Sequence, residues 1–486
     1  MSTRSIGKNF IYNAVLVASN VLLPLITFPY VTRVLQPEAI GQVEFANSVA
    51  NYFVMFAALG IPTYGIRACA RVRDDRAALS QTVRELLVIN TGTMLLALAA
   101  MLASTALVPR LRVDAALLLV NAFLVLLNPI GLNWLYSALE EYRYITLRSI
   151  LFKLVSLVCI FLLVRRPQDV ILYTGINVFA TVGSNLCNLL YSRRYISYRR
   201  LAHYELKKHL RPIFVFFATS VAVSIYTNLD TVMLGFLSGN AQVGYYGTAL
   251  KVRSVLAAVI SALSTVTLPR LSYYAVQQQD DAFRALLRKA ANFTYVVALP
   301  VTLFFCLCAR STVRLLSGES FLPAVPALRF LTVAVLFAGF SGITGTQLLV
   351  PRGQEKRLLQ SILCGAALDF VLNLFLIPRY GAAGAAFATM LAEAAVLAAQ
   401  VTFSWSFLRQ ELPRLGWCKP TLAALGAAAA LTPVLAALQN AGPFLLLAAA
   451  ACVFFGVYAA ALLLLKDETA WQALGQLKQN LPRHRK

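Results

Sequence analysis

Long apolar stretches recur along the whole chain, and each is long enough to cross a lipid bilayer as a helix. Crossing the hydrocarbon core takes ~20 apolar residues. The pattern predicts an all-α polytopic membrane protein with about fourteen transmembrane helices. The composition fits this class, since 13% of the residues are charged and a soluble domain usually has about 25%. The predicted spans are residues 10–33, 42–66, 84–107, 115–137, 146–164, 170–192, 212–237, 243–268, 290–309, 324–350, 358–378, 382–407, 419–438 and 443–465.

The basic residues are distributed unevenly between the two sides of these helices. The net charge is +23, from 43 Lys and Arg against 20 Asp and Glu. When the connections are assigned alternately to two sides, about three quarters of the Lys and Arg fall on one side, as the positive-inside rule expects of the cytoplasm. The opposite side has Arg33, Arg110, Arg112, Arg165, Arg166, Arg310, Arg314 and Arg379, and three basic residues fall inside helices: Lys251, Arg253 and Arg329.

This asymmetry predicts a multi-pass protein of the cell membrane (the cytoplasmic, or inner, membrane) with both termini in the cytoplasm and an even number of helices. We therefore expect anionic membrane lipids, and no nucleic acid, as partners of the basic surface. Arg4 and Lys8 precede an apolar run that is too long for a signal peptide. The first helix is therefore predicted to remain as an anchor.

The longest predicted cytoplasmic connection, residues 193–211, is basic and divides the chain after the sixth helix. We predict an N-terminal six-helix lobe at 1–192, a second six-helix lobe at 212–407, and helices 13 and 14 with a cytoplasmic tail at 408–486. Lobes that both start in the cytoplasm would be parallel repeats. The Ile40-Gly41 and Val243-Gly244 steps support a repeat, since each follows a short predicted turn after the first helix of its lobe.

Four segments resemble the polysaccharide and O-antigen flippases of the multidrug/oligosaccharidyl-lipid/polysaccharide exporter superfamily. They are TRVLQPEAIGQVEFANSVANYF with LGIPTYGIRACA, NWLYSALEEYRYITLRSI, YTNLDTVMLGFLSGNAQVGYYGTALKV, and QLLVPRGQEKR with DFVLNLFLIPRYGAAGAAFATMLAE. Together they extend over about the first 410 residues, in register with a count of fourteen helices. The first hairpin departs mildly from the family, because Gln36 and Ala39 occupy a turn that is often rich in glycine.

This resemblance implies a transporter rather than an enzyme. Its cargo would be an undecaprenyl-diphosphate-linked oligosaccharide, the repeat unit of an O-antigen, capsule or exopolysaccharide. Two six-helix lobes would alternate around a central cavity and move this lipid from the inner to the outer leaflet. A polysaccharide polymerase would be a further candidate partner.

Charged residues inside membrane helices are costly and are functional candidates by default. Residues equidistant from the turn of a helical hairpin lie at equal depth, which suggests pairs. Arg33 and Glu44 are equidistant from a turn centred between Glu38 and Ala39, where they could form a salt bridge or a gate. Asp230 and Lys251 match in the seventh and eighth helices, ~10 Å from their turn. Such a pair either fixes the two helices together or opens during transport.

Arg253 is the leading candidate for substrate contact. It follows Lys251 by two positions, about 200° around the helix, so the two cannot face one cavity. Near mid-membrane it lacks an obvious local partner, and its planar fork suits phosphate oxygens. The alternative is an ion pair with a carboxylate on another helix.

Three further basic residues are candidates for binding the substrate. Arg329 lies about a turn from the outer end of its helix and could instead extend its side chain to the interface. Arg148 and Lys153 begin the fifth helix from the cytoplasm. They could receive the diphosphate from the inner leaflet, or they could simply anchor the helix.

Asp369 and Glu393 are equidistant from Gly381 and are candidates for proton coupling. Two nearby carboxylates would raise the pKa of one of them. Equal depth does not establish proximity, because the two side chains could point apart. Asn373, one turn beyond Asp369, could donate hydrogen bonds to it.

No motif indicates a cofactor, a metal or catalytic chemistry. The sequence has no G-x-x-x-x-G-K-[ST] loop and no Ser-His-Asp arrangement, and all its histidines fall in predicted cytoplasmic segments. We therefore expect transport driven by a gradient or by consumption of the product. The rival hypotheses are a multidrug/cation antiporter, a lipid II flippase of the same superfamily, and a membrane-embedded polysaccharide polymerase or glycosyl transferase, against which the short outside loops argue.

Overall fold

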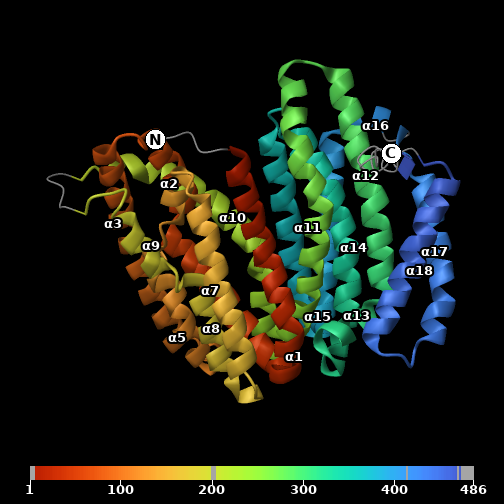
Figure 1. Ribbon diagram of the computed structural model, residues 1–486, viewed down its shortest axis with the longest axis horizontal. Helices are drawn as coiled ribbons and strands as arrows, with labels where there is room; N and C mark the ends of the chain where they lie inside the picture. Colours follow the sequence, from red (N-terminus) through yellow and green to blue (C-terminus); the bar gives the residue numbers. More distant parts are fainter. Residues whose placement is uncertain (1–5, 199–203, 412–413, 468–469, 472–486) are drawn as a thin grey trace, which may run out of the picture. The chain divides into compact units, whose positions relative to one another are not determined.

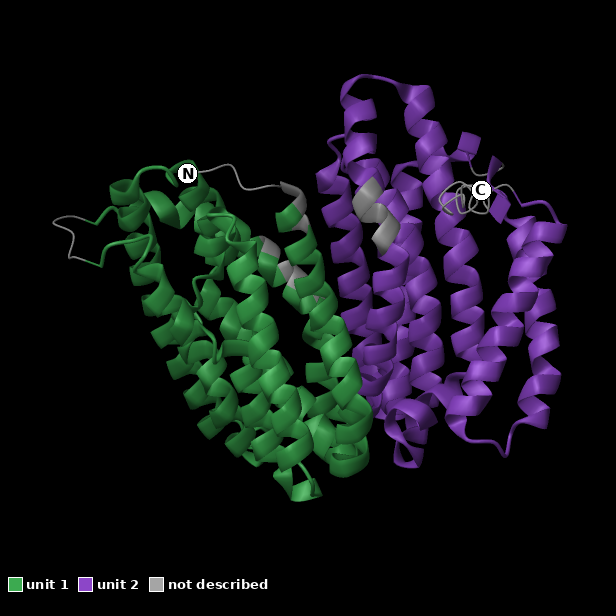
Figure 2. Ribbon diagram, in the orientation of Figure 1, with its two compact units in different colours: residues 1–244 green, residues 245–486 purple. Residues whose placement is uncertain are grey.

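All regular secondary structure in the described part of the chain is helical. The computed structural model describes residues 6–198, 204–411, 414–467 and 470–471. It divides into two compact units, residues 1–244 and 245–486, which are coloured separately in Figure 2. The prediction of an all-α polytopic fold is confirmed.

The first unit is a helical bundle built around α1, which packs against α3, α5, α7 and α10 (Figure 1). Its core gathers apolar residues from several of these helices, with Ile61, Leu86 and Tyr136 fully buried. The helices are α1 (Ile6–Ala58), α2 (Ile61–Arg71), α3 (Arg76–Leu107), α4 (Pro109–Val113), α5 (Ala115–Leu126), η1 (Pro129–Gly131), α6 (Asn133–Ala138), α7 (Tyr142–Leu163), η2 (Pro167–Asp169), α8 (Val170–Val182), α9 (Asn185–Ser192), α10 (Lys207–Leu237) and the start of α11 (Asn240–Val276).

The second unit contains the rest of α11 and a bundle in which α14 packs on α15. The last two long helices pack on each other and on α12, forming a side pair (Figure 1). Two apolar clusters hold this unit together, one around Phe304 and Phe454 and one around Phe283 and Phe407. The helices are α12 (Asp280–Leu307), α13 (Ala309–Ser317), η3 (Glu319–Ala324), α14 (Val325–Ser341), the π-helical η4 (Gly342–Leu349), α15 (Glu355–Phe403), α16 (Trp405–Glu411), α17 (Cys418–Ala437) and α18 (Pro443–Leu464).

The boundary between the units lies later than the basic connection at 193–211, where the sequence divided the chain. Helix α10 packs on α1 and α2, and it therefore belongs to the first unit. The end of the connection is fixed to the same unit by Glu85, a fully buried carboxylate. Glu85 accepts hydrogen bonds from His209 Nε2 (2.9 Å) and the Glu205 backbone N–H (2.9 Å), and it pairs with Lys208 (3.0 Å). The six-helix lobes stay a prediction.

Nine helices of the described residues are long and apolar enough to cross a membrane, or up to ten if the bent α5–α6 pair is one span. The predicted count of fourteen is not confirmed. Two of the nine, α1 and α15, have a break at a non-helical residue. A single long helix in this count can therefore contain more than one crossing.

In α15 the break is a hairpin turn at Gly381, whose φ of 52° suits glycine. The two halves pack face to face: the position of a Cβ on Gly365 lies 2.3 Å from Val396, and Gln400 Nε2 donates to Ser361 Oγ at 3.1 Å. In both contacts the residue of the first half lies one position farther from Gly381 than the residue of the second half. The predicted hairpin turn is therefore present, and its register differs by about one residue from the match of Asp369 with Glu393 that the sequence predicted.

In α1 the break lies at Gln36 (φ 68°, ψ 167°), not between Glu38 and Ala39 as expected. Pro37 explains the shift, because a proline disfavours helical geometry in the residue before it. The halves fold back on each other, since Leu16 of the first half and Leu59, the residue that directly follows the second half, pack on the same apolar cluster. The break therefore lies about two residues before the turn centre from which equal depth was predicted for Arg33 and Glu44, and their pairing stays a prediction.

The two turns with the predicted repeat signature pack against each other inside the first unit. A Cβ on Gly41 would lie 1.7 Å from the Asn240 carbonyl oxygen, and a Cβ on Gly244 would lie 2.2 Å from the Pro37 carbonyl oxygen. The two contacts are reciprocal, because each glycine contacts the residue that lies four positions before the other glycine. This reciprocity agrees with an internal repeat and explains the glycines.

Several predicted spans are not continuous helices. The span 42–66 is interrupted between α1 and α2, and 170–192 between α8 and α9. Span 324–350 ends in the π-helical η4. The largest bend is in 115–137, where α5 and the η1–α6 segment meet at 49°. This last interruption shapes the site described next.

Candidate functional site

A basic cavity of about 940 Å³ lies in the first unit, between the start of α1 and the first turns of α7. Its wall combines three cations with three tyrosines and one carboxylate. The lining residues are Lys8, Asn9, Tyr12, Glu141, Arg143, Tyr144, Leu147, Arg148, Leu151 and Tyr191. Lys8 and Arg143 are exposed, whereas Arg148 is 9% exposed. The cavity therefore extends from a basic surface to a buried cation.

Arg148 is held by neutral groups alone in the described part of the chain. Its guanidinium donates to Asn188 Oδ1, to Asn133 Oδ1 at 3.0 Å and to Ser149 Oγ at 3.4 Å. It also lies over the Tyr144 ring, 5.6 Å from the centroid. Amides and a π-face orient a cation without cancelling its charge. Arg148 therefore presents a full positive charge at the cavity wall.

The carboxylate of this cavity has a partner of its own. The Tyr195 hydroxyl donates a hydrogen bond to Glu141 Oε1. Burial, followed by this hydrogen bond, raises the pKa of the Tyr195 phenol, so the proton stays on the tyrosine. Tyr144 and Tyr191 stack at 4.0 Å beside it. The aromatic wall is therefore rigid and rich in hydroxyl groups.

One partner of Arg148, Asn133, begins α6 directly after the break between α5 and α6, and another, Asn188, belongs to α9. Leu132 has a left-handed φ of 48° there, and the break leaves backbone carbonyls outside a regular helix. Asn185 Nδ2 donates to the Leu127 carbonyl at 2.9 Å, and Asn188 Nδ2 donates to the Gly131 carbonyl. Side-chain amides of α9 therefore stabilise the break. The break in turn places Asn133 within hydrogen-bond distance of Arg148.

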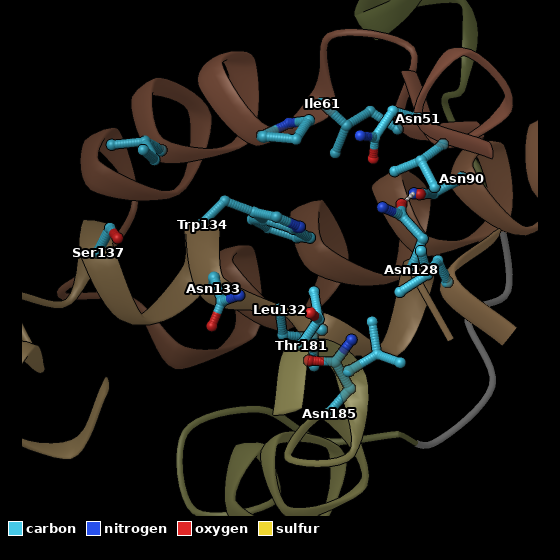
Figure 3. A pocket seen from close by; sticks show the side chains of 16 residues that line it. Asn51, Ile61, Asn90, Asn128, Leu132, Asn133, Trp134, Ser137, Thr181 and Asn185 are labelled. Atoms are coloured by element: carbon cyan, nitrogen blue, oxygen red, sulfur yellow. Dashed lines mark hydrogen bonds between the residues drawn. The ribbon is translucent and has the colours of Figure 1, made fainter. Parts of the chain in front are cut away.

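A second cavity, of about 370 Å³, is lined in part by residues of this break (Figure 3). Its polar lining consists of amides and hydroxyls together with the indole of one tryptophan. The lining residues are Asn51, Val54, Ile61, Pro62, Ile66, Asn90, Leu124, Asn128, Gly131, Leu132, Asn133, Trp134, Ser137, Thr181, Val182 and Asn185. Asn133 lines this cavity and accepts the hydrogen bond from Arg148, so the two cavities are neighbours.

In the second unit, Arg253 forms an ion pair. Arg253 Nη2 lies 2.7 Å from Glu393 Oε1, and Glu393 is 4% exposed. This is the alternative that the sequence left open, a carboxylate on another helix. The expectation that Arg253 lacks a nearby partner is wrong, because the relative rotation of α11 and α15 cannot be read from spacing. Its role as a substrate contact stays a prediction.

The predicted coupling residues lie on the facing halves of the α15 hairpin. Ser361, Gly365, Asp369 and Asn373 follow one another at four-residue spacing and are all buried. Asn373 Nδ2 donates to Asp369 Oδ2 at 3.1 Å, which is the hydrogen bond that the sequence suggested. Glu393 belongs to the opposite half of the hairpin and forms the ion pair with Arg253. Their part in coupling stays a prediction.

The remaining predicted residues have separate surroundings. Lys153 donates to Asn20 Oδ1 of α1, and Arg329 Nε donates to the Cys306 carbonyl at 3.2 Å. Arg33 Nη1 donates to the Pro29 carbonyl at 2.6 Å. Asp230 is buried in the first unit and Lys251 is half-buried in the second. The pairings of Asp230 with Lys251 and of Arg33 with Glu44 stay predictions.

The sequence reasoning missed the amides around the helix break. Asn128, Pro129 and Gly131 interrupt the apolar span 115–137. Asn-Pro and glycine are turn signals, so their combination within a membrane span could have indicated the break. The partnership of Arg148 with Asn188 had no signal, because it joins helices that are far apart in the sequence.

Residues 6–275 match the family described as polysaccharide biosynthesis protein. The chain belongs to this family. The match covers more than half of the chain and includes the first unit with both cavities.

Two relatives that match over nearly their whole length support this assignment. The chain is 24% identical to the "Putative O-antigen transporter" of Escherichia coli (strain K12) over 401 residues, 82% of this chain and 96% of the relative. The protein of the same name from Shigella dysenteriae is also 24% identical, over 80% of this chain and 98% of that protein.

Solved transporters share the fold. The lipid II flippase MurJ in its inward closed conformation superposes with a TM-score of 0.72 at 13% identity, covering 92% of this chain and 99% of MurJ. An inward-facing multidrug resistance MATE transporter gives a TM-score of 0.60 at 15% identity, over 82% of this chain and 98% of that chain. The chain is thus a multi-pass membrane protein with the fold of the superfamily that the sequence suggested.

Proposed function

We propose that this protein is a flippase for a lipid-linked oligosaccharide. Its cargo is an undecaprenyl-diphosphate-linked repeat unit, which it moves from the inner to the outer leaflet by alternating access. The family match and the names of the relatives support the class of transporter. The observation that supports the cargo is the basic cavity, in which Arg148 is buried against neutral partners.

A buried arginine with neutral partners is costly inside a membrane protein. The cost of burying a charge is relieved when an opposite charge binds it. A diphosphate supplies this charge, and a guanidinium binds phosphate oxygens bidentately through its planar fork. The proposed role of Arg148 is therefore to bind the diphosphate.

The exposed cations of the cavity would attract the diphosphate before it reaches Arg148. Lys8 and Arg143 lie toward the surface of the cavity, at the end that the positive-inside rule assigns to the cytoplasm. The tyrosine hydroxyls nearby can donate to phosphate or sugar oxygens. This arrangement fits entry from the inner leaflet, with both termini cytoplasmic and the protein in the inner membrane.

The other candidates keep separate proposed roles. Arg253, Lys251, Arg329 and Lys153 are further contacts that the substrate could meet along its path. Asp369, Asn373 and Glu393 are proposed coupling groups, together with Asp230. A proton on Glu393 would weaken its pair with Arg253 and release the guanidinium, which gives this buried pair a way to respond to a gradient.

A multidrug/cation antiporter is the second candidate, favoured by the buried carboxylates Asp369 and Glu393 and by the MATE-like fold. Its cargo would be cationic, and the basic cavity would repel it. A lipid II flippase would share the lipid diphosphate and differ only in the saccharide. The choice of glycolipid in the assay separates these alternatives.

The test is transfer between leaflets in liposomes. Purified protein is reconstituted with undecaprenyl-diphosphate oligosaccharide extracted from bacteria, with lipid II in parallel vesicles, and sugar exposure is followed with a membrane-impermeant oxidant. We expect wild type to expose the oligosaccharide, and Arg148→Ala to expose it much more slowly. Arg112→Ala is the matched control, because Arg112 is an exposed arginine that donates to the Ala106 carbonyl.

The proposal fails if folded wild type moves no glycolipid under a proton or sodium gradient. Gradient-driven export of a cationic dye by the same vesicles would then support the antiporter. Transfer of lipid II alone would change the proposed saccharide of the cargo, whereas the proposed diphosphate site would stand.

A further inference from the structure

The second cavity of the first unit is lined by neutral side chains only (Figure 3). Asn51, Asn90 and Asn128 gather at one end, and Trp134 lies across the middle. Asn90 and Asn185 are buried, whereas Asn51 and Asn133 are exposed. The cavity therefore leads from the surface of the unit into its interior, and its volume of about 370 Å³ is within the usual range of ligand pockets.

This lining suits a neutral ligand that bears hydroxyl groups. An asparagine side chain both donates and accepts hydrogen bonds, as a sugar hydroxyl does. The indole of Trp134 offers a flat apolar face and a polar edge, matching the apolar face and polar rim of a pyranose ring. An apolar ligand would leave the amides unpaired, which is costly in a buried site.

One of the amides, that of Asn90, has hydrogen-bonding capacity that the fold does not use. Asn185 Nδ2 is committed to the broken helix, through the Leu127 carbonyl. In contrast, Asn90 is 4% exposed, and its Oδ1 atom has no partner among the described residues. Its only donation there, to Asn128 Oδ1, is long at 3.4 Å. A buried amide oxygen without a partner costs free energy that a ligand hydroxyl would recover.

The position of the cavity fits the chemistry of a glycosyl diphosphate. In that linkage the first sugar is bonded directly to a phosphate, so a diphosphate site and a sugar site must be adjacent. Asn133 lines the neutral cavity and accepts the 3.0 Å hydrogen bond from Arg148, which lines the basic one. A diphosphate that binds Arg148 would compete for this hydrogen bond and free Asn133 to bind a sugar.

We infer that the neutral cavity is a saccharide subsite, which binds a sugar of the lipid-linked oligosaccharide while Arg148 binds its diphosphate. This inference rests on the proposed function and adds a contact that recognises the saccharide part of the cargo. Asn90, Asn128 and Asn133 supply hydrogen bonds to hydroxyls, and Trp134 supplies the stacking face. The subsite would therefore distinguish a glycosylated carrier lipid from the bare diphosphate.

The experiment compares the binding of two lipids to purified protein in nanodiscs. One is the undecaprenyl-diphosphate oligosaccharide extracted from bacteria, chosen as the glycolipid that wild type transfers, and the other is undecaprenyl diphosphate without sugar. We expect Asn90→Leu and Trp134→Leu each to weaken glycolipid binding by about tenfold, the effect of one good contact. Their binding of the bare lipid should equal wild type.

Asn121→Leu is the matched control. Asn121 of α5 is fully buried, its amide atoms also have no partner among the described residues, and it is not among the residues that line the cavity. We expect this variant to bind both lipids as wild type does. Thermal midpoints verify folding, and Asn90→Ser, a smaller change, replaces Asn90→Leu if that variant unfolds.

Three results overturn the inference. The first is that both cavity variants bind the glycolipid as tightly as wild type does. The second is that Asn121→Leu loses as much glycolipid affinity as they do, which indicates a structural effect. The third is a parallel loss of the bare lipid, which assigns the cavity to the diphosphate. Failure of wild type to bind or transfer any glycolipid would instead overturn the proposed function.

Discussion

Each unit contains a basic side chain inside its helical bundle, and the two are balanced in different ways. In the first unit Arg148 is held by the amides of Asn133 and Asn188 and by the ring of Tyr144. In the second unit Arg253 is paired with Glu393 at 2.7 Å. Neutral partners orient the charge and preserve it, whereas a carboxylate cancels it.

This difference separates a binding role from a structural or coupling role. A cation that keeps its charge can bind an incoming anion without first losing a partner. A cation in an ion pair must exchange one carboxylate for another anion, which lowers its net gain. We therefore assign the diphosphate to the cavity of Arg148 and regard the pair in the second unit as a link between α11 and α15.

The largest expected effect comes from removing the carboxylate of the ion pair. Glu393→Ala should lower the free energy of unfolding by about 3–5 kcal/mol, because a half-buried cation loses its counter-charge. The measurement is unfolding by sodium dodecyl sulfate, followed by circular dichroism. The double variant Arg253→Leu with Glu393→Leu should recover most of the loss, and if it is less stable than Glu393→Ala, the pair is not the source of the effect.

Replacement of the charge in the first unit should act on binding more than on stability. Arg148→Gln keeps an amide that can bond to Asn133 and Asn188, but it removes charge-assisted hydrogen bonds to the ligand. We expect an affinity for undecaprenyl diphosphate about 10–100-fold lower, measured in nanodiscs. Arg148→Lys should be intermediate, because it restores the charge without the planar fork. Equal affinity for undecaprenyl diphosphate in all three proteins would show that Arg148 does not bind the diphosphate.

The exposed cations of the basic cavity should contribute less, and in a way that depends on salt. Lys8→Ala and Arg143→Ala should each weaken binding by about two- to fivefold at low ionic strength. The loss should shrink at 0.5 M salt, because exposed charges are screened. Affinities at the two ionic strengths test this, and a loss that is independent of salt would show that these side chains bind the lipid directly.

The smallest effect is expected for Arg329, a third kind of basic residue. Its side chain is exposed and donates to the Cys306 carbonyl. Arg329→Ala should change the free energy of unfolding by less than about 0.5 kcal/mol, as usual for surface substitutions. The same detergent titration measures it. A loss as large as that of Glu393→Ala would show that exposure does not distinguish the two arginines.

The sequence predicts most of the helical layout, because apolar length and glycine positions are local properties. The Gly381 hairpin turn follows from spacing alone, and so does the hydrogen bond between Asp369 and Asn373, whereas the register follows only to within one residue. The turn at Gln36 was misplaced because the effect of Pro37 on the preceding residue was not considered.

The partners of the buried cations could not be predicted in the same way. Which face of α11 meets α15 depends on packing across many residues, so Glu393 could not be assigned to Arg253 from depth. The site of Arg148 depends on a helix break and on an amide that is 40 residues away along the chain. Long-range contacts of this kind leave no periodic signal in a single sequence.

The most direct test compares the two buried arginines in one transfer assay. Liposomes contain undecaprenyl-diphosphate oligosaccharide and either wild type, Arg148→Ala or Arg253→Ala, and the rate of sugar exposure is measured at equal amounts of folded protein. The account predicts transfer by wild type, loss of most transfer in Arg148→Ala, and a smaller loss in Arg253→Ala that is relieved when Glu393 is also neutralised. Full transfer by Arg148→Ala with loss in Arg253→Ala would contradict it and place the diphosphate in the second unit.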